Sequence, residues 1–338
     1  LQGEDGATVS GNTIGNFDAV NAENDNGIWL APSTINTIIS GNIISGLGYA
    51  GTGAAAPTGI NITSNVSGAN LTVTGNFISG LTSAGGTTDV STNGILVGFG
   101  TTGASIKNNT INNIKNTNAS GWGAAGILLS STSTSANCTV ANNFVFDVAG
   151  FGFAGGNADD NGNGITVNSG AGYNIYYNTV HMNTSQTLVT GLPAALLVTA
   201  GVTTAGAIDV RNNIFTNSQT LGTERYAIYS GAANTVFSNI DYNDYYTTGP
   251  NLAFIGSNRA NLAAIQAGFG ANTNSLNVLP NFVSATDLHL NNNGTNASLF
   301  STGTVVSVTT DIDCANRGGN PDIGADQVSI AVVAVGVE

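Results

Sequence analysis

Residues 93–114 read NGILVGFGTTGASIKNNTINNI. Aliphatic residues alternate with polar ones in steps of two, as at Ile95 and Val97, and this is the period of a β-strand rather than a helix. Asn and Gly stand where one short run gives way to the next, and both residues favour corners. The segment therefore predicts three short strands: one of the form G-I-x-φ, where φ is aliphatic, one that ends just before an Asn, and one that starts after it.

The pattern repeats along the chain in steps of about 30 to 35 residues, which is the spacing of repeat architectures. One Asn marks each unit, at Asn12, Asn42, Asn76, Asn109, Asn143, Asn178, Asn213 and Asn243. A β-branched aliphatic stands three residues before every one of them, at Val9, Ile39, Val73, Ile106, Val140, Ile175, Val210 and Ile240. The G-I-x-φ runs supply further inward pairs, at Ile28/Leu30, Ile60/Ile62, Ile95/Val97, Ile127/Leu129, Ile165/Val167 and Leu196/Val198.

Strands this short bury one face only if successive units stack on each other in parallel. The sequence thus predicts an all-β fold, a right-handed parallel β-helix of about eight coils with three short strands per coil; the hand follows from the general preference of parallel crossovers. We expect the repeated Asn to occupy the corner after the second strand in left-handed geometry, which Asn tolerates well. Its amide should also form a ladder with the Asn of neighbouring coils.

Insertions of about ten residues precede each G-I-x-φ strand, so they should line one edge of the solenoid, where repeat proteins often bind their partners. These insertions carry four aromatic residues, Tyr49, Trp122, Phe151 and Phe153. Two interpretations remain open. The rings could stack on the sugar rings of a glycan, or they could cover apolar surface beneath the loops.

The repeat stops near Tyr246, and the segment NRANLAAIQAGFG then predicts one short helix with Leu262 and Ile265 facing inward. A solenoid needs a cap over the open end of its core. We therefore divide the chain into a β-helix over residues 1–250 and a capping segment over 251–338 that is continuous with it. Arg317 lies among Asp311, Asp313 and Asp322 and is predicted to tie the cap together as an ion pair.

The repeats and the tail resemble a known family. G-I-x-φ and φ-x-x-N-x-φ resemble the right-handed β-helix repeats of the pectate-lyase-like superfamily, and the tail resembles the end segment of secreted bacterial surface proteins of the Bacteroidetes type. The residues that carry this second resemblance are Leu279-Pro280-Asn281-Phe282-Val283, Asp287-Leu288-His289-Leu290, Asp311-Ile312-Asp313, Arg317 and Pro321-Asp322-Ile323-Gly324-Ala325-Asp326. Cys314 departs from the family pattern, which commonly has Gly there. The resemblance implies an extracellular or cell-surface location and, for many such proteins, a type IX secretion route.

The net charge and the hydropathy of the chain limit the classes of partner that it can bind. The chain has a net charge of −13 and only six Lys and Arg residues, whereas a phosphate backbone requires basic side chains. We therefore expect no nucleic-acid partner, and the lack of a long apolar run predicts no membrane insertion. The first residues, LQGEDG, and the strand-like end predict a piece of a larger surface protein. Cys138 and Cys314 are far apart in sequence and are predicted to be buried free thiols.

Two patterns could carry chemistry. Asp209 and Arg211, with Asp241 at the equivalent place one coil later, could form the acid–base cluster of a polysaccharide lyase or glycoside hydrolase, or a solvated surface pair. The run DDNGNG at residues 159–164 places Asp159, Asn161 and Asn163 at the spacing of half a calcium loop, so these residues could hold Ca²⁺. The closing Glu of an EF-hand is absent, since Gly170 stands there.

His181 and His289 lie on unrelated segments, and His181 is predicted to be an exposed strand residue. With few bases and no evident convergent acid group, the sequence favours a non-enzymatic extracellular module that acts as an adhesin or stiff spacer and binds polysaccharide or cell-surface glycans along the loop edge. The alternative is a polysaccharide lyase or glycoside hydrolase acting in a groove of the β-helix, and whether the protein is an enzyme stays open.

Overall fold

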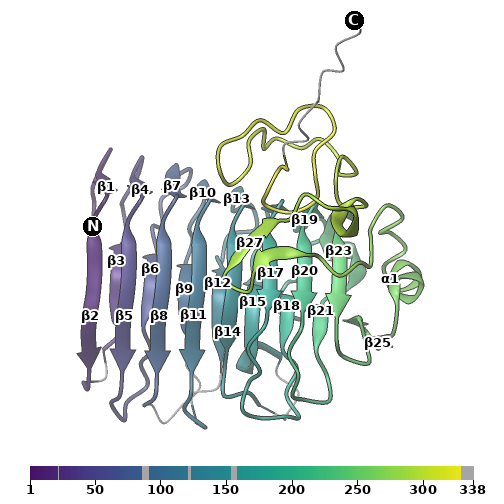
Figure 1. Cartoon of the computed structure of the whole chain (residues 1–338). Coiled ribbons are helices and arrows are strands. Elements are labelled where there is room, and N and C mark those ends of the chain that lie inside the picture. The colour runs from purple at the N-terminus through teal and green to yellow at the C-terminus, as the bar shows by residue number, and fades with distance from the viewer. Residues whose placement is uncertain (22, 86–90, 121–122, 154–157, 329–338) are drawn as a thin grey trace, which may run out of the picture.

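The structure, a computed structural model, describes residues 1–21, 23–85, 91–120, 123–153 and 158–328. The predicted right-handed parallel β-helix is confirmed: the chain winds through three parallel sheets that enclose one core (Figure 1). Two of the sheets contain eight strands each, which delimit seven turn-to-turn steps, slightly fewer than the eight coils expected. We number the sheets by the order in which the first coil meets them.

Sheet 1 consists of β1 (Thr8–Ser10), β4 (Ile38–Ser40), β7 (Leu71–Thr74), β10 (Ala104–Lys107), β13 (Cys138–Ala141), β16 (Tyr173–Tyr176), β19 (Ile208–Arg211) and β22 (Phe237–Asp241). Sheet 2 consists of β2 (Thr13–Ala19), β5 (Ile43–Tyr49), β8 (Phe77–Ser83), β11 (Thr110–Asn116), β14 (Phe144–Ala149), β17 (Thr179–Met182), β20 (Ile214–Asn217) and β23 (Asp244–Thr247). Sheet 3 consists of β3 (Asn26–Leu30), β6 (Thr58–Ile62), β9 (Thr92–Val97), β12 (Ala124–Ser130), β15 (Gly162–Ser169), β18 (Ala194–Val198), β21 (Tyr226–Ser230), β24 (Ala253–Ile255) and β25 (Asn258–Arg259). Short 3₁₀ turns occur at Ala158–Asp160, Asn234–Val236 and Gly294–Asn296.

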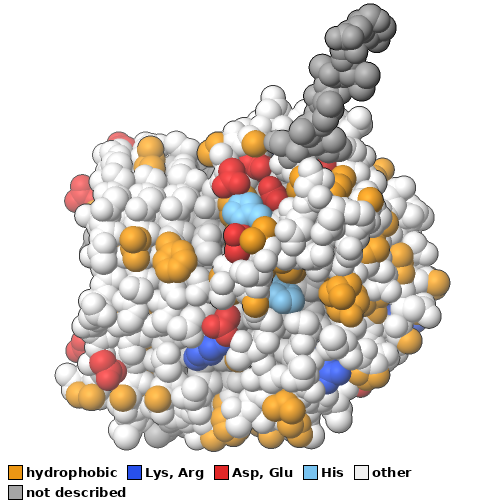
Figure 2. Space-filling view, viewed as in Figure 1, with side chains coloured by type: hydrophobic (Ala, Val, Ile, Leu, Met, Phe, Trp, Pro, Cys, Tyr) orange, Lys and Arg blue, Asp and Glu red, His pale blue; other side chains and the backbone are white. Residues whose placement is uncertain are grey.

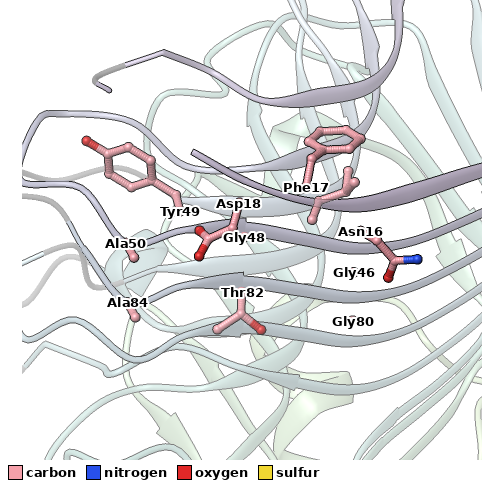
Figure 3. Close-up of a pocket in the computed structure, with 11 residues that line it drawn as sticks. Asn16, Phe17, Asp18, Gly46, Gly48, Tyr49, Ala50, Gly80, Thr82 and Ala84 are labelled. Atoms are coloured by element: carbon pink, nitrogen blue, oxygen red, sulfur yellow. The ribbon is translucent and has the colours of Figure 1, made fainter. Parts of the chain in front are cut away.

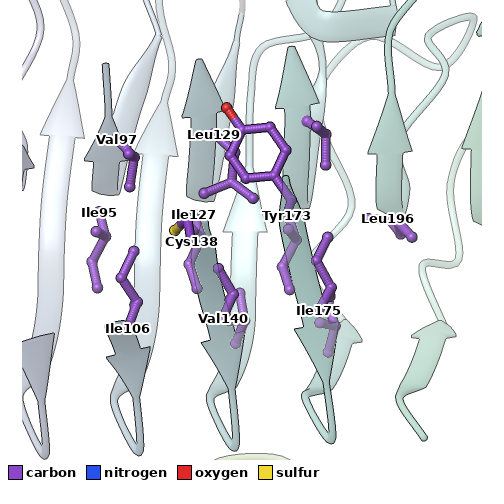
Figure 4. Close-up of a cluster of buried hydrophobic side chains, with 14 of the residues drawn as sticks. Ile95, Val97, Ile106, Ile127, Leu129, Cys138, Val140, Tyr173, Ile175 and Leu196 are labelled. Carbon is purple, nitrogen blue, oxygen red and sulfur yellow. The ribbon is translucent and has the colours of Figure 1, made fainter. Parts of the chain in front are cut away.

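The core is built from columns of aliphatic side chains, each set directly over its equivalent in the preceding coil (Figure 4). In sheet 3, Ile60 pairs in register with Ile95, which pairs with Ile127. All three are fully buried, as are the second members of their predicted inward pairs. Each buried aliphatic side chain stabilises the fold by about 1.5–3 kcal/mol, so the stacked columns supply the main force that holds the coils together.

The predicted asparagine ladder is confirmed along its whole length. Nδ2 of Asn76 donates to Oδ1 of Asn109 at 2.9 Å, and the backbone N–H of Asn76 donates to the same oxygen at 3.0 Å. The equivalent bonds link every pair of neighbours from Asn12 to Asn243. The ladder ends on a hydroxyl, because the backbone N–H of Asn243 donates to Oγ of Ser275. These amides are buried from Asn42 onward. Because water does not reach them there, the ladder supplies the hydrogen bonds that these buried polar groups require.

The predicted left-handed conformation of the ladder asparagines is wrong by one residue. The positive φ angles fall on the residue just before each ladder Asn, at Gly11, Gly41, Gly75, Asn108, Asn142, Tyr177, Asn212 and Tyr242. We call these eight residues the corner column. A left-handed residue here reverses the chain sharply, so the side chain of the residue that follows points into the interior, where its amide can join the ladder.

Beyond the repeat, the chain first closes the end of the solenoid. β24 pairs in parallel with β21, and the predicted helix is confirmed as α1 (Leu262–Phe269), with Ile265 and Phe269 buried against the core. Asn261 begins this helix by accepting a hydrogen bond from the backbone N–H of Ala264. The division of the chain after residue 250 stays a prediction.

Residues 279–328, which we call the C-terminal lobe, fold back along the side of the β-helix (Figure 1). The lobe contains a hairpin of β26 (Phe282–Ser284) and β27 (Asp287–Leu290). Its Leu288 and Ala325 pack on Phe144 and Phe146 of β14, and its Leu290, Leu299 and Ile323 pack on Ile214 of β20. The lobe therefore covers the outer face of sheet 2 over its later coils and leaves the earlier coils bare.

The corner column changes its residue type where the lobe begins. It is Gly in the first three coils, whereas Asn108, Asn142, Tyr177 and Asn212 all hydrogen-bond to backbone carbonyls of the lobe at 2.7–2.8 Å. A side chain at this corner points outward, so four successive coils each use it to hold the lobe.

Arg317 ties the lobe down, but the predicted ion pair is wrong. Its guanidinium lies 3.9 Å over the ring of Tyr177 and donates to Oδ1 of Asn142 and to the carbonyl oxygens of Thr310, Asp322, Gly324 and Ala325. Within the described part of the chain, no carboxylate reaches ion-pair distance of it. Burial lowers the pKa of Arg317 to about 10, so it stays charged at neutral pH.

Both thiols are free, as predicted. Cys138 is buried in the core, and burial raises its pKa to about 12. The predicted burial of Cys314 is wrong: the residue is exposed, with a positive φ of 68°. That backbone geometry favours glycine, so Cys314 occupies a position where its side chain adds strain.

Candidate functional site

The half of the sheet 2 outer face that the C-terminal lobe leaves bare carries exposed apolar side chains and a groove. One outward column runs in register through Ile43, Phe77, Thr110 and Phe144. Ile43 and Phe77 are 46% and 42% exposed, whereas Phe144, beneath the lobe, is 4% exposed. The same kind of position is therefore covered in the later coils and accessible in the earlier ones.

A shallow groove of about 430 Å³ crosses this bare face (Figure 3). Its surface is formed by Asn16, Asp18, Gly46, Gly48, Gly80 and Thr82, which we call the glycine groove. A Cβ atom on Gly46 would lie 2.8 Å from Oδ1 of Asn16, and one on Gly48 would lie 2.9 Å from Oδ1 of Asp18. The glycines thus let both polar side chains lie across the backbone of β5.

The groove depends on a stacked irregularity of sheet 2. One residue of each early strand is left out of the pairing register and adopts a positive φ, at Asn16, Gly46, Gly80, Asn113 and Asp147. Gly46 and Gly80 have no side chain, so a hollow forms between Asn16 on one side and Asn113 on the other. An amide, a carboxylate and a hydroxyl line the hollow, and such groups recognise ligands rich in hydroxyls.

The predicted catalytic residues are only partly brought together. Arg211 donates to both oxygens of Asp209, from Nε at 2.7 Å and from Nη2 at 2.6 Å, and the hydroxyl of Tyr176 donates to Asp209 at 2.9 Å. These bonds to Asp209 raise the pKa of Arg211. Asp241 pairs with Arg211 in register, but its carboxylate accepts from the backbone N–H and the amide of Asn274, each at 2.8 Å.

This arrangement satisfies the groups internally. The carboxylate of Asp209 is held by a bidentate guanidinium and a phenol, and Asp241 fastens the segment that follows α1. A general base must be free to accept a proton from the substrate, and neither carboxylate is presented in that way.

The predicted aromatic edge is divided in the structure. Tyr49 is 1% exposed, and its hydroxyl accepts from the backbone N–H of Gly53, so its ring lies within the fold. Phe151 and Phe153 are half-buried, and the carbonyl of Phe151 accepts from the backbone N–H of Leu188. Trp122 lies outside the described residues. Of the rings that the structure describes, that of Tyr49 is therefore closed to a ligand, and those of Phe151 and Phe153 are partly covered.

The predicted calcium residues also have structural partners. Oδ1 of Asn161 accepts from Nε2 of Gln186 at 2.8 Å and from the backbone N–H of Leu192 at 3.0 Å. Oδ1 of Asn163 accepts from the backbone N–H of Ala194 at 3.1 Å. Both asparagines are buried, whereas Asp159 is exposed. Amide oxygens engaged in this way are poorly placed to ligate Ca²⁺ together with Asp159.

His181 is half-buried, and its predicted exposure is wrong. It faces an apolar pocket of about 420 Å³ between sheet 2 and the lobe, where its ring meets that of Phe282 edge-on at 5.2 Å. Its Nδ1 lies 2.7 Å from the hydroxyl of Thr216. Burial lowers the pKa of His181 to about 4, so this imidazole is neutral at physiological pH.

The structure groups residues that the sequence analysis did not connect. His289 of β27 lies 2.5 Å from Oδ1 of Asp287 through Nδ1 and 3.0 Å from Oδ2 of Asp313 through Nε2. Asp326 completes the group, and single ligand atoms of His289, Asp313 and Asp326 all lie within 4.8 Å of one another. Figure 2 shows acidic side chains gathered around one histidine of this face. The alternation of D-L-H-L was the available signal, since it sets Asp287 and His289 on one side of a strand.

Comparisons with known proteins add no name to this geometry: no family model matches the chain, and neither a curated protein nor a solved structure matches it. Among the described residues, no helix combines the length and apolar character needed to cross a bilayer.

Proposed function

We propose that the protein is a non-enzymatic extracellular module of a bacterial surface protein, which serves as a stiff spacer or adhesive element. The observation that carries the proposal is the unbroken asparagine ladder, in which a buried amide joins every coil to the next from Asn12 to Asn243. With the aliphatic columns beside it, the ladder makes each coil a rigid continuation of the one before.

The surface location rests on composition and on resemblance. Only 7% of the residues are charged, so Asn, Ser, Thr and Gly provide most of the polar surface. The G-I-x-φ repeat and the P-D-I-G-A-D tail resemble those of secreted bacterial β-helix proteins. These features support the proposal of a cell-surface protein that follows a type IX route.

The adhesive surface that we propose is the bare half of sheet 2, rather than the loop edge. Phe77 presents a half-exposed ring beside the linked pair of Ser79 and Asn112, whose side chains are joined at 2.8 Å. The glycine groove lies farther along the same strands of sheet 2. An accessible aromatic ring next to hydroxyls and amides is a common arrangement for binding a saccharide, so we propose glycans as the ligands of this face.

The rival function is a polysaccharide lyase or glycoside hydrolase that uses Asp209, Arg211 and Asp241. It has weaker support, because the Asp209 carboxylate is engaged by Arg211 and Tyr176 and the Asp241 carboxylate by Asn274.

A glycan array probed with the purified chain tests the proposal, together with an assay for reducing sugars and unsaturated products on the polysaccharides that bind. We expect saturable binding without cleavage. Binding should be lost in Phe77→Ala and kept in Phe99→Ala, whose ring is 68% exposed at another corner. Cleavage that is abolished by Asp209→Asn would establish the rival function, and an array without hits would contradict the glycan proposal.

A further inference from the structure

The cluster around His289 joins three separate segments of the C-terminal lobe. Asp287 and His289 come from β27, Asp313 from the turn after Asp311, and Asp326 from the last described stretch of the chain. The two residues of β27 are two positions apart, so the strand itself places them on one side. The other two are brought in by the fold of the lobe.

The imidazole of His289 is fixed in orientation. Its Nδ1 faces Oδ1 of Asp287 at 2.5 Å, and its ring meets that of Phe144 edge-on at 4.9 Å. A carboxylate on one ring nitrogen and an aromatic wall beside the ring leave Nε2 directed at Asp313, 3.0 Å away. A histidine that binds a metal is commonly held in this way, with its second nitrogen bonded to a carboxylate.

Asp326 supplies an independent observation. Asp326 is only 7% exposed, and its Oδ2 accepts a hydrogen bond from the backbone N–H of Leu290 at 2.8 Å. Its other oxygen accepts from no donor in the part of the chain that the structure describes. This Oδ1 is not among the atoms of the described residues that are closed off from solvent without a partner, so it is open to a cation that arrives from solvent.

We propose that His289, Asp313 and Asp326 bind a divalent first-row transition-metal ion, with Asp287 orienting the imidazole from outside the coordination shell. An imidazole nitrogen with two carboxylates suits Zn²⁺ and its neighbours better than Ca²⁺ or Mg²⁺, which prefer all-oxygen sites. Bonds of about 2.0–2.2 Å at tetrahedral angles separate ligand atoms by roughly 3.3 Å. The 3.0 Å between Nε2 of His289 and Asp313 therefore needs to widen only slightly.

The ion would cross-link three segments of the C-terminal lobe. It would join β27, the turn at Asp313 and the end segment at Asp326 directly over Phe144, to which the lobe is docked. Asp313 is exposed, so solvent reaches the outer side of the site and water can complete the coordination.

The geometry has one competing explanation, in which a protonated His289 bridges Asp287 and Asp313 without any metal. Titration of the full chain with Zn²⁺ by calorimetry, after removal of metals with a chelator, separates the two. We expect one ion per chain in the micromolar range, a higher unfolding temperature with Zn²⁺, and little response to Ca²⁺.

Variants assign the ligands. Binding should be abolished in His289→Ala and Asp326→Asn, weakened about 10- to 100-fold in Asp287→Asn, and unchanged in the matched control His181→Ala. If the ligand variants fail to fold, the ¹⁵N signals of the wild-type imidazoles give the answer, because Zn²⁺ should shift Nε2 of His289 and leave His181 unaffected. Absence of saturable Zn²⁺ binding, equal binding by His289→Ala, or preference for Ca²⁺ would overturn the proposal.

Discussion

Asn109 and Asn143 lie one coil apart, and Nδ2 of the first donates to Oδ1 of the second at 3.0 Å within the buried part of the ladder. Oδ1 of Asn143 also accepts from the backbone N–H of Asn109, while Nδ2 of Asn143 donates onward to Asn178. The side chain of Asn143 thus accepts from two N–H donors in the preceding coil and donates to one oxygen in the next coil.

Replacing Asn143 by Ala should lower the free energy of unfolding by about 2–4 kcal/mol, because buried groups of both neighbours lose their partner. Chemical denaturation of the variant and the wild type measures the difference. Asn65→Ala is the control, since Asn65 is exposed, and it should change stability by about 0.5 kcal/mol or less. Equal effects of the two substitutions would contradict a stabilising ladder.

Phe77 and Phe144 occupy one outward column of sheet 2, and only the second lies beneath the lobe. Phe144→Ala should cost about 3–5 kcal/mol of unfolding free energy, as for other buried aromatic residues. Phe77→Ala should cost less than about 1 kcal/mol. Thermal and denaturant unfolding of the two variants check the pair, and similar losses would mean that the lobe does not dock on β14.

Asp244 is fully buried, with Oδ1 accepting from the backbone N–H of Val278, and burial raises its pKa to about 8. The unfolded chain releases this proton near the ordinary value of 3.8, whereas the folded chain retains it. Stability should therefore fall as pH rises from about 4 to 8, by about 1.4 kcal/mol per pH unit for this one group.

Asp244→Asn keeps the bond to Val278 and cannot ionise, so its stability advantage over the wild type should grow with pH across that window. Denaturation curves of both proteins at several pH values give the difference. Glu4→Gln, at an exposed carboxylate, should run parallel to the wild type. A constant offset between Asp244→Asn and the wild type would show that Asp244 ionises normally in the fold.

Arg317→Lys should loosen the lobe, because a lysine ammonium can satisfy only some of the carbonyls that Arg317 binds and cannot stack flat on Tyr177. We expect a loss of about 2–4 kcal/mol and faster proteolysis within residues 279–328. Arg225→Lys is a suitable control, since Arg225 also binds backbone carbonyls but outside the lobe. Unchanged protease resistance in Arg317→Lys would be the contrary result.

The two thiols should differ sharply in reactivity. Cys314 is exposed, while Cys138 is buried with a pKa near 12, and the thiolate is the reactive form. A thiol reagent should modify one cysteine rapidly in the native protein and the second only after unfolding. Rapid modification of two thiols in the native state would show that the core around Cys138 opens readily.

The β-helix could be predicted because the contacts that stabilise it repeat at a regular interval in the sequence. The aliphatic columns and the ladder recur at fixed offsets, and α1 has its own apolar spacing, so each element is visible in the local sequence. The lobe has no period, and its contacts join residues far apart, such as Asn142 with Thr310. The grouping of His289 with Asp326 depends on that docking and was not foreseen. The change of the corner column from Gly to Asn and Tyr was a usable signal that we did not interpret.

The corner column also has a consequence for how the protein comes apart. An array of like units normally frays one unit at a time, because each unit contacts only its neighbours. Here Asn108, Asn142, Tyr177 and Asn212 are bound to one common clamp, so four successive turns should open together or not at all. The coils with Gly at the same corner lack that restraint, so they should unfold first when the protein is heated or stretched.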